Sequence, residues 1–296
     1  MNILIASVHN IRTNEIKVLA EEMNKSHKVS ILSHAEGRAC RGLAFRYKEE
    51  PVMLEPLLYK DVVKNTGWVW KKDIQQIKSE AKSKVDAFDG IVAYGFHGEP
   101  AESMAIMLNN IMEHKQPDLV ICGIGNGAML GQDIYCSSYI GMAMEAAFNR
   151  VPVIVVSVGR HVGGHGEDTL KPTVDFISKN LEKIIAVNAE LPPHTFLTFN
   201  FPVVKKVKDY KGVKVTRLGA MSELSKYVEK VDTDGHKYYW ADYVERKNVS
   251  KGDENAGTWF DRGYITVTPI NYDSTDYELL KKFDFITKRQ ASGGEK

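Results

Sequence analysis

The chain has 296 residues, of which 43% are hydrophobic and 26% are charged, and its formal net charge is +1. These values are ordinary for a globular protein, and they give no electrostatic argument for a nucleic-acid or membrane partner. The three cysteines, Cys40, Cys122 and Cys136, show neither metal-ligand nor disulfide spacing. This usage is typical of a reducing compartment and predicts a cytoplasmic protein. No apolar run approaches the ~18 residues of a membrane-spanning helix, and residues 1–5 predict a strand rather than a signal peptide.

Strand, helix and strand alternate at the start of the chain. Ile3–Ser7 predicts a short apolar strand, residues 13–15 a helix start followed by apolar residues at helical spacing, and His27–Leu32 a second strand. This order is typical of the βαβ unit of a parallel, doubly wound sheet, so the predicted fold class is α/β. Ligands of such sheets bind beyond the carboxyl ends of the strands. We therefore expect the loops after Ala6, Leu32 and Cys122 to surround one site.

The same alternation continues further along the chain. The pattern predicts strands in 87–95, 118–122, 151–158 and 196–202, with the most apolar one, 151–158, in the middle of the sheet, and helices in 140–145 and 172–185. Beyond residue 203, β-rich runs alternate with polar turns, as in long hairpins. The charge-rich residues 287–296 predict a disordered tail.

A glycine-rich loop is expected after the strand 118–122, with Gly123, Gly125, Gly127 and Gly131. Ser137 and Ser138 then precede a helix start, and free N–H groups at such a start favour an anion. The glycine spacing matches neither the phosphate-binding P-loop nor the dinucleotide fingerprint. The residues that we predict to bind a ligand are Asn10, Glu99, Gly125, Asn126, Gly127, Ser137, Ser138 and Tyr139.

Several stretches resemble one known family. The family's signature sequence is matched in register by Gly123–Ile124, Leu130–Gly131 and Ala143–Glu145, and by single residues between them. Further matches lie in residues 212–219, 238–240 and 263–269. The chain is similar to the SurE family of metal-dependent nucleoside-monophosphate phosphatases. The resemblance implies a three-layer α/β/α domain with a Rossmann-like, mostly parallel sheet in residues 1–203. It also implies a β-hairpin-rich extension in 204–286 that exchanges between subunits, giving a homodimer or homotetramer.

The positions that correspond to the family's metal ligands have changed. The resemblance implies two aspartates, a serine and an asparagine where this chain has Val8, His9, Ala39 and Gly125. Mg²⁺ and Mn²⁺ require oxygen ligands, above all carboxylates. We therefore predict no metal ligands and no cofactor, with Mg²⁺ or Mn²⁺ expected only if this registration is wrong.

The remaining candidates for acid–base chemistry are His9, His97 and Asp133, together with His34. His9 stands at the expected site, and histidine titrates near neutral pH. Three interpretations of other residues stay open. Glu99 either contacts the ligand or caps the helix that starts at Pro100. Tyr139 either stacks on a base or sugar of the ligand or packs in the core. His161 and His165 either form a transition-metal site or lie in a solvated loop.

Three functions follow from these residues. The first is a divergent hydrolase that acts on a nucleotide or a related phosphorylated or nucleoside-like small molecule without the family's metal site. The second is a conventional metal-dependent nucleoside-monophosphate phosphatase, which requires either a different registration of the ligand positions or a substitute site built from His9, His34 and Asn126. The third is a non-catalytic subunit that binds such a ligand.

Overall fold

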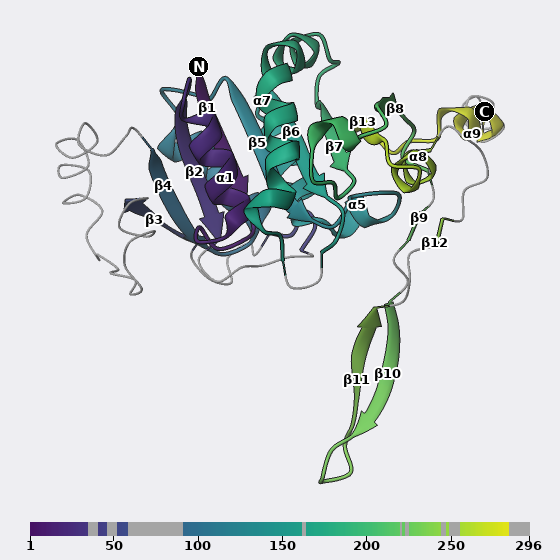
Figure 1. Ribbon diagram of the computed structural model, residues 1–296. Coiled ribbons are helices and arrows are strands. Elements are labelled where there is room, and N and C mark those ends of the chain that lie inside the picture. Colours follow the sequence, from purple (N-terminus) through teal and green to yellow (C-terminus); the bar gives the residue numbers. More distant parts are fainter. Residues whose placement is uncertain are drawn as a thin grey trace, which may run out of the picture.

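The computed structural model describes residues 1–34, 41–45, 52–58, 91–161, 164–219, 221–222, 225–243, 247–248 and 255–283 (Figure 1). Strands and helices alternate through most of the chain. The strands are β1 (Asn2–Ser7), β2 (Lys28–His34), β3 (Met53–Leu58), β4 (Val92–His97), β5 (Leu119–Asn126), β6 (Val153–Val158), β7 (Thr195–Phe201), β8 (Val213–Val215), β9 (Met221–Ser222), β10 (Ser225–Val231), β11 (Lys237–Tyr243), β12 (Lys247–Asn248) and β13 (Ile265–Asn271). The helices are α1 (Asn14–Met23), α4 (Pro100–Ile106), α5 (Asp133–Cys136), α6 (Ser138–Phe148), α7 (Glu167–Ala189), α8 (Ala256–Asp261) and α9 (Tyr277–Leu280), with the short π- or 3₁₀-helical turns η2 (Met107–Ile111), η3 (Val207–Asp209) and η4 (Lys281–Phe283).

One nine-stranded sheet forms the centre of the molecule. Its strand order is β3-β4-β2-β1-β5-β6-β7-β13-β8. The strands from β4 to β7 in this order are parallel, whereas β3 is antiparallel to β4 and β13 is antiparallel to β7. The carboxyl ends of β2, β1 and β5 therefore lie next to one another at one edge, as the sequence predicts, and that of β6 lies beside β5.

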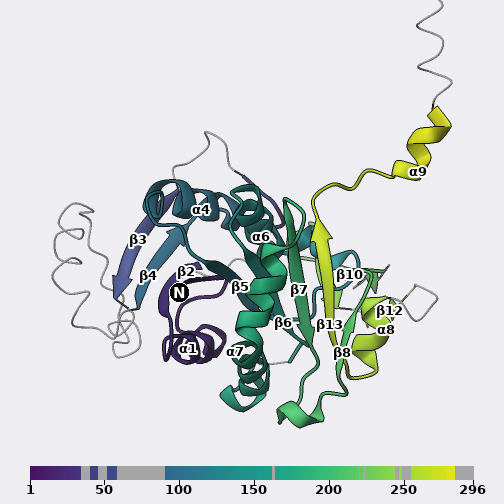
Figure 2. The same ribbon diagram turned by 90° about the horizontal axis from the view of Figure 1, so that it is seen from above.

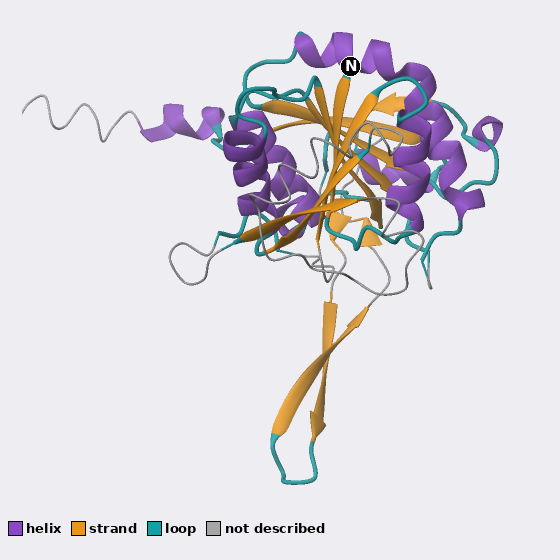
Figure 3. Cartoon of the chain, turned by 90° about the vertical axis from the view of Figure 1, so that its left-hand side faces the viewer, coloured by secondary structure: helices purple, strands orange, loops and turns teal. Residues whose placement is uncertain are grey.

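Helices cover both faces of this sheet (Figures 2 and 3). Ile3 and Ile5 of β1 belong to a core cluster with residues of α1 and α7. Leu4 and Ala6, which point to the opposite face, belong to a second cluster with residues of α4 and α6. Because alternate residues of a strand point to opposite faces, a strand buried on both faces is a continuous apolar run. The predicted three-layer α/β/α architecture is confirmed.

The extension after residue 203 contributes to two different parts of the structure. β8 and β13 join the nine-stranded sheet, whereas β10 and β11 form an antiparallel hairpin that projects from the body (Figure 1). The confirmed hairpin matches the predicted alternation of β-rich runs and polar turns. The division at residue 203 remains a prediction, and the tail 287–296 lies outside the described residues.

Several predicted boundaries are wrong, three of them with a clear structural reason. The expected glycine loop begins later, because β5 continues through Gly123 and Gly125 and pairs with β6 as far as Asn126, beyond an irregularity in the register after Cys122. β2 ends at His34 rather than Leu32, since its last residues pair with β4. α7 begins at Glu167, so that Pro172 lies inside the helix and two acidic residues occupy the first turn, where the helix dipole favours them.

None of the described helices combines the length and the apolar character that crossing a membrane requires.

Candidate functional site

The candidate site lies at the carboxyl edge of the sheet, where β1, β5 and β6 end. α6 begins beside these ends and is capped by Ser137, whose hydroxyl accepts a hydrogen bond from the backbone N–H of Ile140 at 3.4 Å. This cap confirms the predicted helix start after the glycine-containing segment. It also points Tyr139, in the first turn of α6, toward the end of β1.

Tyr139 links the ends of β1 and β5. Its hydroxyl lies 3.1 Å from Oγ of Ser7, 3.4 Å from Nδ1 of His9 and 3.4 Å from the carbonyl oxygen of Ile124. Only 5% of Tyr139 is exposed, and its ring belongs to the core cluster beneath α6. Burial raises the pKa of the phenol, so the hydroxyl stays neutral. This burial favours the core interpretation of Tyr139 over stacking on a ligand.

The space beside Gly125 is filled by two other side chains. A Cβ atom added to Gly125 would lie 2.6 Å from Cε of Met129 and 3.4 Å from Cε2 of Tyr139. Met129 is fixed in turn, because its backbone N–H donates to Oδ1 of Asn200 at 2.7 Å and its sulfur accepts from the hydroxyl of Ser137 at 3.2 Å. A larger residue at 125 would therefore require the methyl end of Met129 to move.

Val8 and His9 follow β1 but have different surroundings. Val8 is 1% exposed and lies in the core cluster of α4 and α6. His9 is half-buried, its carbonyl oxygen accepts from Oγ of Ser33 at 2.8 Å, and its N–H donates to Oγ of Ser7 at 3.1 Å. Burial lowers the pKa of His9, and the negative charge of Glu15 partly offsets this effect. The imidazole is therefore predominantly neutral near pH 7.

Other predicted ligand-binding residues surround this edge. Asn126 is bound to His161 in both directions, since its Oδ1 accepts from the His161 N–H at 3.0 Å and its Nδ2 donates to the His161 carbonyl at 3.3 Å. Gly127 adopts a φ of 128°, which favours glycine, and donates to the carbonyl of Val158 at 2.7 Å. Asn10 accepts from the N–H of Arg12 at 3.1 Å. These contacts fix the loops that follow β1, β5 and β6.

Glu99 and Ser138 hold another segment, residues 41–45. Oε2 of Glu99 lies 3.6 Å from Nε of Arg41, and Oγ of Ser138 accepts from the Arg41 N–H at 2.9 Å. Glu99 occupies the N-cap position of α4 without a side-chain capping hydrogen bond, and it is only 3% exposed. Glu99 was expected either to contact the ligand or to cap α4. The structure shows instead a contact with Arg41.

The remaining predicted residues are more widely spread. His97 ends β4, which β2 separates from β1, while Asp133 is the first residue of α5. His34 is 1% exposed and packs edge-on against Phe96 at 4.8 Å between ring centroids. Ala39 lies outside the described residues.

Two residues of the site were missed by the sequence analysis. Ser7 was assigned only to the first strand and Glu15 only to a helix start, yet Ser7 contacts Tyr139 and the charge of Glu15 acts on His9. The signal for Ser7 was its place at the carboxyl end of the first strand, directly before Val8 and His9. For Glu15 no comparable signal exists, since a glutamate in the first turn of a helix is common.

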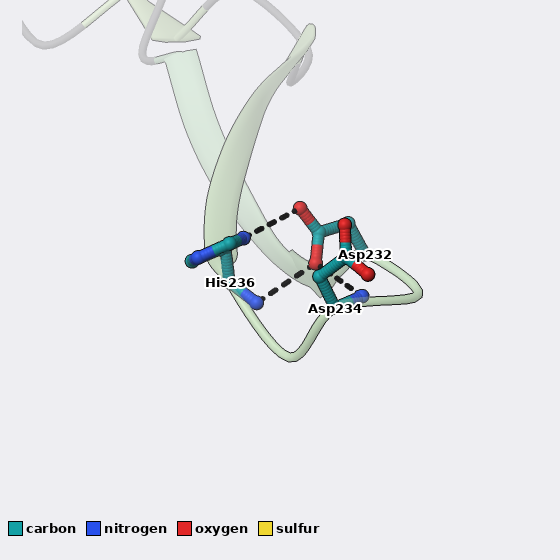
Figure 4. A group of neighbouring side chains, drawn as sticks. All are labelled: Asp232, Asp234 and His236. Carbon is teal, nitrogen blue, oxygen red and sulfur yellow. Dashed lines mark hydrogen bonds and ion pairs between the residues drawn. The ribbon is translucent and has the colours of Figure 1, made fainter.

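One further group of possible metal ligands lies at the tip of the hairpin (Figure 4). Among the described residues, Asp232, Asp234 and His236 are the only three of their kind whose ligand atoms lie within 4.8 Å of one another, and all three are exposed. Asp232 accepts hydrogen bonds from the N–H groups of Asp234 at 2.9 Å and His236 at 2.8 Å. These contacts serve the turn between β10 and β11, and the group lies apart from the sheet edge.

The fold and the sequence place the chain among SurE proteins. A solved structure described as a SurE protein from Aquifex aeolicus has the same fold, with a TM-score of 0.68 over 97% of this chain and 100% of that chain at 23% identity. The model of the family described as "Survival protein SurE" matches residues 3–224. The chain therefore belongs to the SurE family, as its motifs predict.

Curated relatives support the same assignment. A protein from Thermoanaerobacter sp. (strain X514), named 5'-nucleotidase SurE, is 32% identical over 197 residues, which are 67% of this chain and 74% of that protein. A relative of the same name from Vibrio cholerae (strain N16961) is 30% identical over 203 residues, or 68% of this chain and 76% of that protein. The family thus includes proteins named as nucleotidases.

Proposed function

We propose that this chain hydrolyses a nucleotide or a related phosphorylated or nucleoside-like small molecule, without the family's Mg²⁺ or Mn²⁺ site. The names of the curated relatives support the nucleotide-like substrate. The observation that carries the proposal is the hydroxyl of Tyr139, which bridges Ser7, His9 and the Ile124 carbonyl between the ends of β1 and β5.

The residues at this edge do not suit a hard cation. Mg²⁺ and Mn²⁺ are held by several oxygen ligands in a regular arrangement. Val8 offers a buried hydrocarbon, Gly125 offers no side chain, and Met129 and Tyr139 fill the space that a residue 125 side chain would take. Of the changed positions that the structure describes (Val8, His9 and Gly125), only His9 has a ligand atom in its side chain, and that atom is a nitrogen. Chemistry at this edge is therefore assigned to the side chains of the chain itself.

His9 is the proposed general base. One assignment of hydrogens satisfies every contact of Tyr139: its hydroxyl donates to the Ile124 carbonyl and accepts from Oγ of Ser7 and from Nδ1–H of His9. This assignment leaves a lone pair on Nε2 of the neutral imidazole. Nε2 can then take a proton from a water molecule as that water attacks the ligand. Tyr139 and Ser7 act as positioning residues that fix the orientation of the ring.

Phosphate release from nucleoside monophosphates tests this function, measured with Mg²⁺, with Mn²⁺ and with EDTA. We expect turnover that resists EDTA and disappears in His9→Ala. Turnover that requires Mg²⁺ or Mn²⁺ would contradict the metal-free site and support the conventional phosphatase. Saturable nucleotide binding without turnover would instead contradict the hydrolase and support a binding subunit.

We further propose that the hairpin of β10 and β11 mediates self-association, giving a homodimer or homotetramer. Its aromatic side chains are exposed, including Tyr227 at 65%, Tyr239 at 59% and Trp240 at 62%. Exposed aromatic side chains are enriched at protein interfaces, and here they occupy both faces of the hairpin. Light scattering of the wild type and of Trp240→Glu tests this. We expect an oligomer that the substitution dissociates, and a monomeric wild type would contradict the proposal.

A further inference from the structure

A second group of polar side chains lies where the start of α1 meets the start of α7. Nδ2 of Asn14 donates to the carbonyl of His165 at 2.9 Å, and Nζ of Lys17 lies 2.7 Å from Oε1 of Glu167. These two contacts hold the first turn of α1 against the segment that leads into α7. Glu15, next to Asn14, is thereby brought close enough to His165 for its negative charge to raise the pKa of that imidazole, against the larger lowering by burial.

His165 has a buried nitrogen atom that the chain leaves without a hydrogen bond. The residue is 3% exposed, and its Nδ1 lies 3.3 Å from Oγ1 of Thr169. When that hydroxyl donates to the Gly166 carbonyl at 2.9 Å, it accepts from Nδ1–H of His165, and this tautomer leaves the lone pair on Nε2. The Gly159 carbonyl is near enough to favour protonation of the ring, but Nε2 makes no hydrogen bond within the described part of the chain. A buried acceptor without a partner is costly.

His161 presents the same arrangement four residues earlier. Its Nδ1 lies 2.8 Å from the carbonyl oxygen of Gly164, which can only accept, so Nε2 of the neutral ring again carries the lone pair. The two imidazole rings are 5.6 Å apart between centroids. Metal-bound histidines typically donate their second ring N–H to a protein oxygen in this way, which fixes the tautomer and the orientation of the ring.

Glu15 adds a buried carboxylate to the pair. It is 6% exposed, and no lysine or arginine among the described residues forms an ion pair with it. Burying a carboxylate without a compensating cation is expensive.

We propose that His161, His165 and Glu15 bind a borderline divalent cation such as Zn²⁺, at a position distinct from the edge between β1 and β5. Two imidazoles and one carboxylate are a known ligand set for Zn²⁺ with a fourth position left open, whereas Mg²⁺ prefers oxygen ligands alone. The three ligand atoms are not yet gathered within 4.8 Å of one another. Binding therefore includes rotation of the exposed His161 ring, and of the Glu15 side chain, toward Nε2 of His165.

Metal titration of the tag-free, full-length protein tests this site directly, after EDTA treatment and removal of the chelator. Zn²⁺ binding is followed by calorimetry, and Co²⁺ binding by the visible absorption of a tetrahedral complex. We expect one equivalent to bind, and we expect His161→Ala and His165→Ala each to weaken binding at least about tenfold. Glu15→Gln, which keeps the size of the side chain, is expected to weaken it as well.

His236→Ala is the matched control, because it disrupts the other group of possible ligands, at the hairpin tip. We expect this variant to bind Zn²⁺ with the same affinity as the wild type. His161 is exposed, so His161→Ala remains informative even if replacing the buried His165 unfolds the chain. The proposal is overturned if the wild type shows no saturable Zn²⁺ binding, or if binding survives in His161→Ala. Neither result depends on whether the chain hydrolyses a nucleotide.

Discussion

Two groups of polar side chains occupy the same edge of the sheet and differ in how completely they are bonded. In the first, between β1 and β5, the hydroxyls of Ser7 and Tyr139 and Nδ1 of His9 contact one another. In the second, between α1 and α7, Nε2 of His165 is buried without a hydrogen bond in the described chain, beside the buried Glu15.

Buried polar groups are nearly always satisfied, so an exception requires an explanation. The first group is complete without any ion, which supports chemistry by the side chains alone. In the second group, the proposed cation would give Nε2 of His165 the partner that the described chain does not supply. On the proposals above, one position no longer suits a hard cation and another suits a borderline one.

The largest expected effect comes from removing the imidazole of the first group. If Nε2 of His9 is the general base, His9→Ala lowers kcat for phosphate release by at least about 100-fold. His27→Ala, which removes a histidine at the start of β2 far along the sheet from this edge, is expected to leave kcat unchanged. Equal rates for wild type and His9→Ala would remove His9 from the mechanism.

Restoring a side chain at residue 125 tests how tightly the first group is packed. Gly125→Asn places a Cβ atom 2.6 Å from Cε of Met129, and we expect a loss of about 1–3 kcal/mol in the free energy of unfolding. Urea unfolding measures this change. Gly235→Asn is the control, since a Cβ there meets nothing within 4 Å and asparagine tolerates its φ of 87°. A stable Gly125→Asn variant that gains Mn²⁺ binding would contradict the packing argument.

The hydroxyl of Tyr139 is expected to contribute less. Tyr139→Phe keeps the buried ring but removes the contacts to Ser7, His9 and Ile124, which costs about 1–2 kcal/mol and leaves the Ser7 hydroxyl with one contact fewer. Thermal unfolding of Tyr139→Phe and of Tyr227→Phe, a variant of the exposed hairpin, provides the comparison. Equal losses in the two variants would show that the bridge has no special role.

The smallest expected effect comes from another buried tyrosine hydroxyl with a hydrogen-bond partner, which lies on the α7 side of the sheet. Tyr210 lies 3.1 Å from Oγ1 of Thr173, and burial raises its pKa to about 12. The folded state therefore keeps the proton when the unfolded state loses it, so this contribution is complete below pH ~10 and is lost as the pH rises from ~10 through about 12.

Unfolding of the wild type and of Tyr210→Phe, compared at pH 8 and pH 11, measures that contribution. We expect the wild type to lose more stability than the variant over this interval. A parallel decline in both proteins would show that Tyr210 does not titrate differently in the folded state.

The sequence predicted much of this architecture from local patterns. Apolar runs such as 151–158 predict strands because a sheet buried on both faces needs continuous hydrocarbon, and Ser137 predicts a helix start because its hydroxyl caps free N–H groups. The continuation of β5 through Gly123 and Gly125 was not predictable, because glycine is read as a loop residue and the pairing with β6 is non-local.

The site was predictable only in part, for the same reason. His9 and Tyr139 were candidates because they stand at strand and helix ends, but their contact joins residues 130 positions apart. The approach of Glu15 to His165 depends on how α1 packs against α7, which no motif encodes. Sequence therefore identified the edge, and packing decided which side chains meet there.

Anomalous scattering from crystals grown with Mn²⁺ tests the central claim most directly. We expect no manganese peak between the ends of β1 and β5, where the hydroxyl of Tyr139 bridges Ser7 and His9. A well-occupied Mn²⁺ ion bonded to His9 at that position would contradict it.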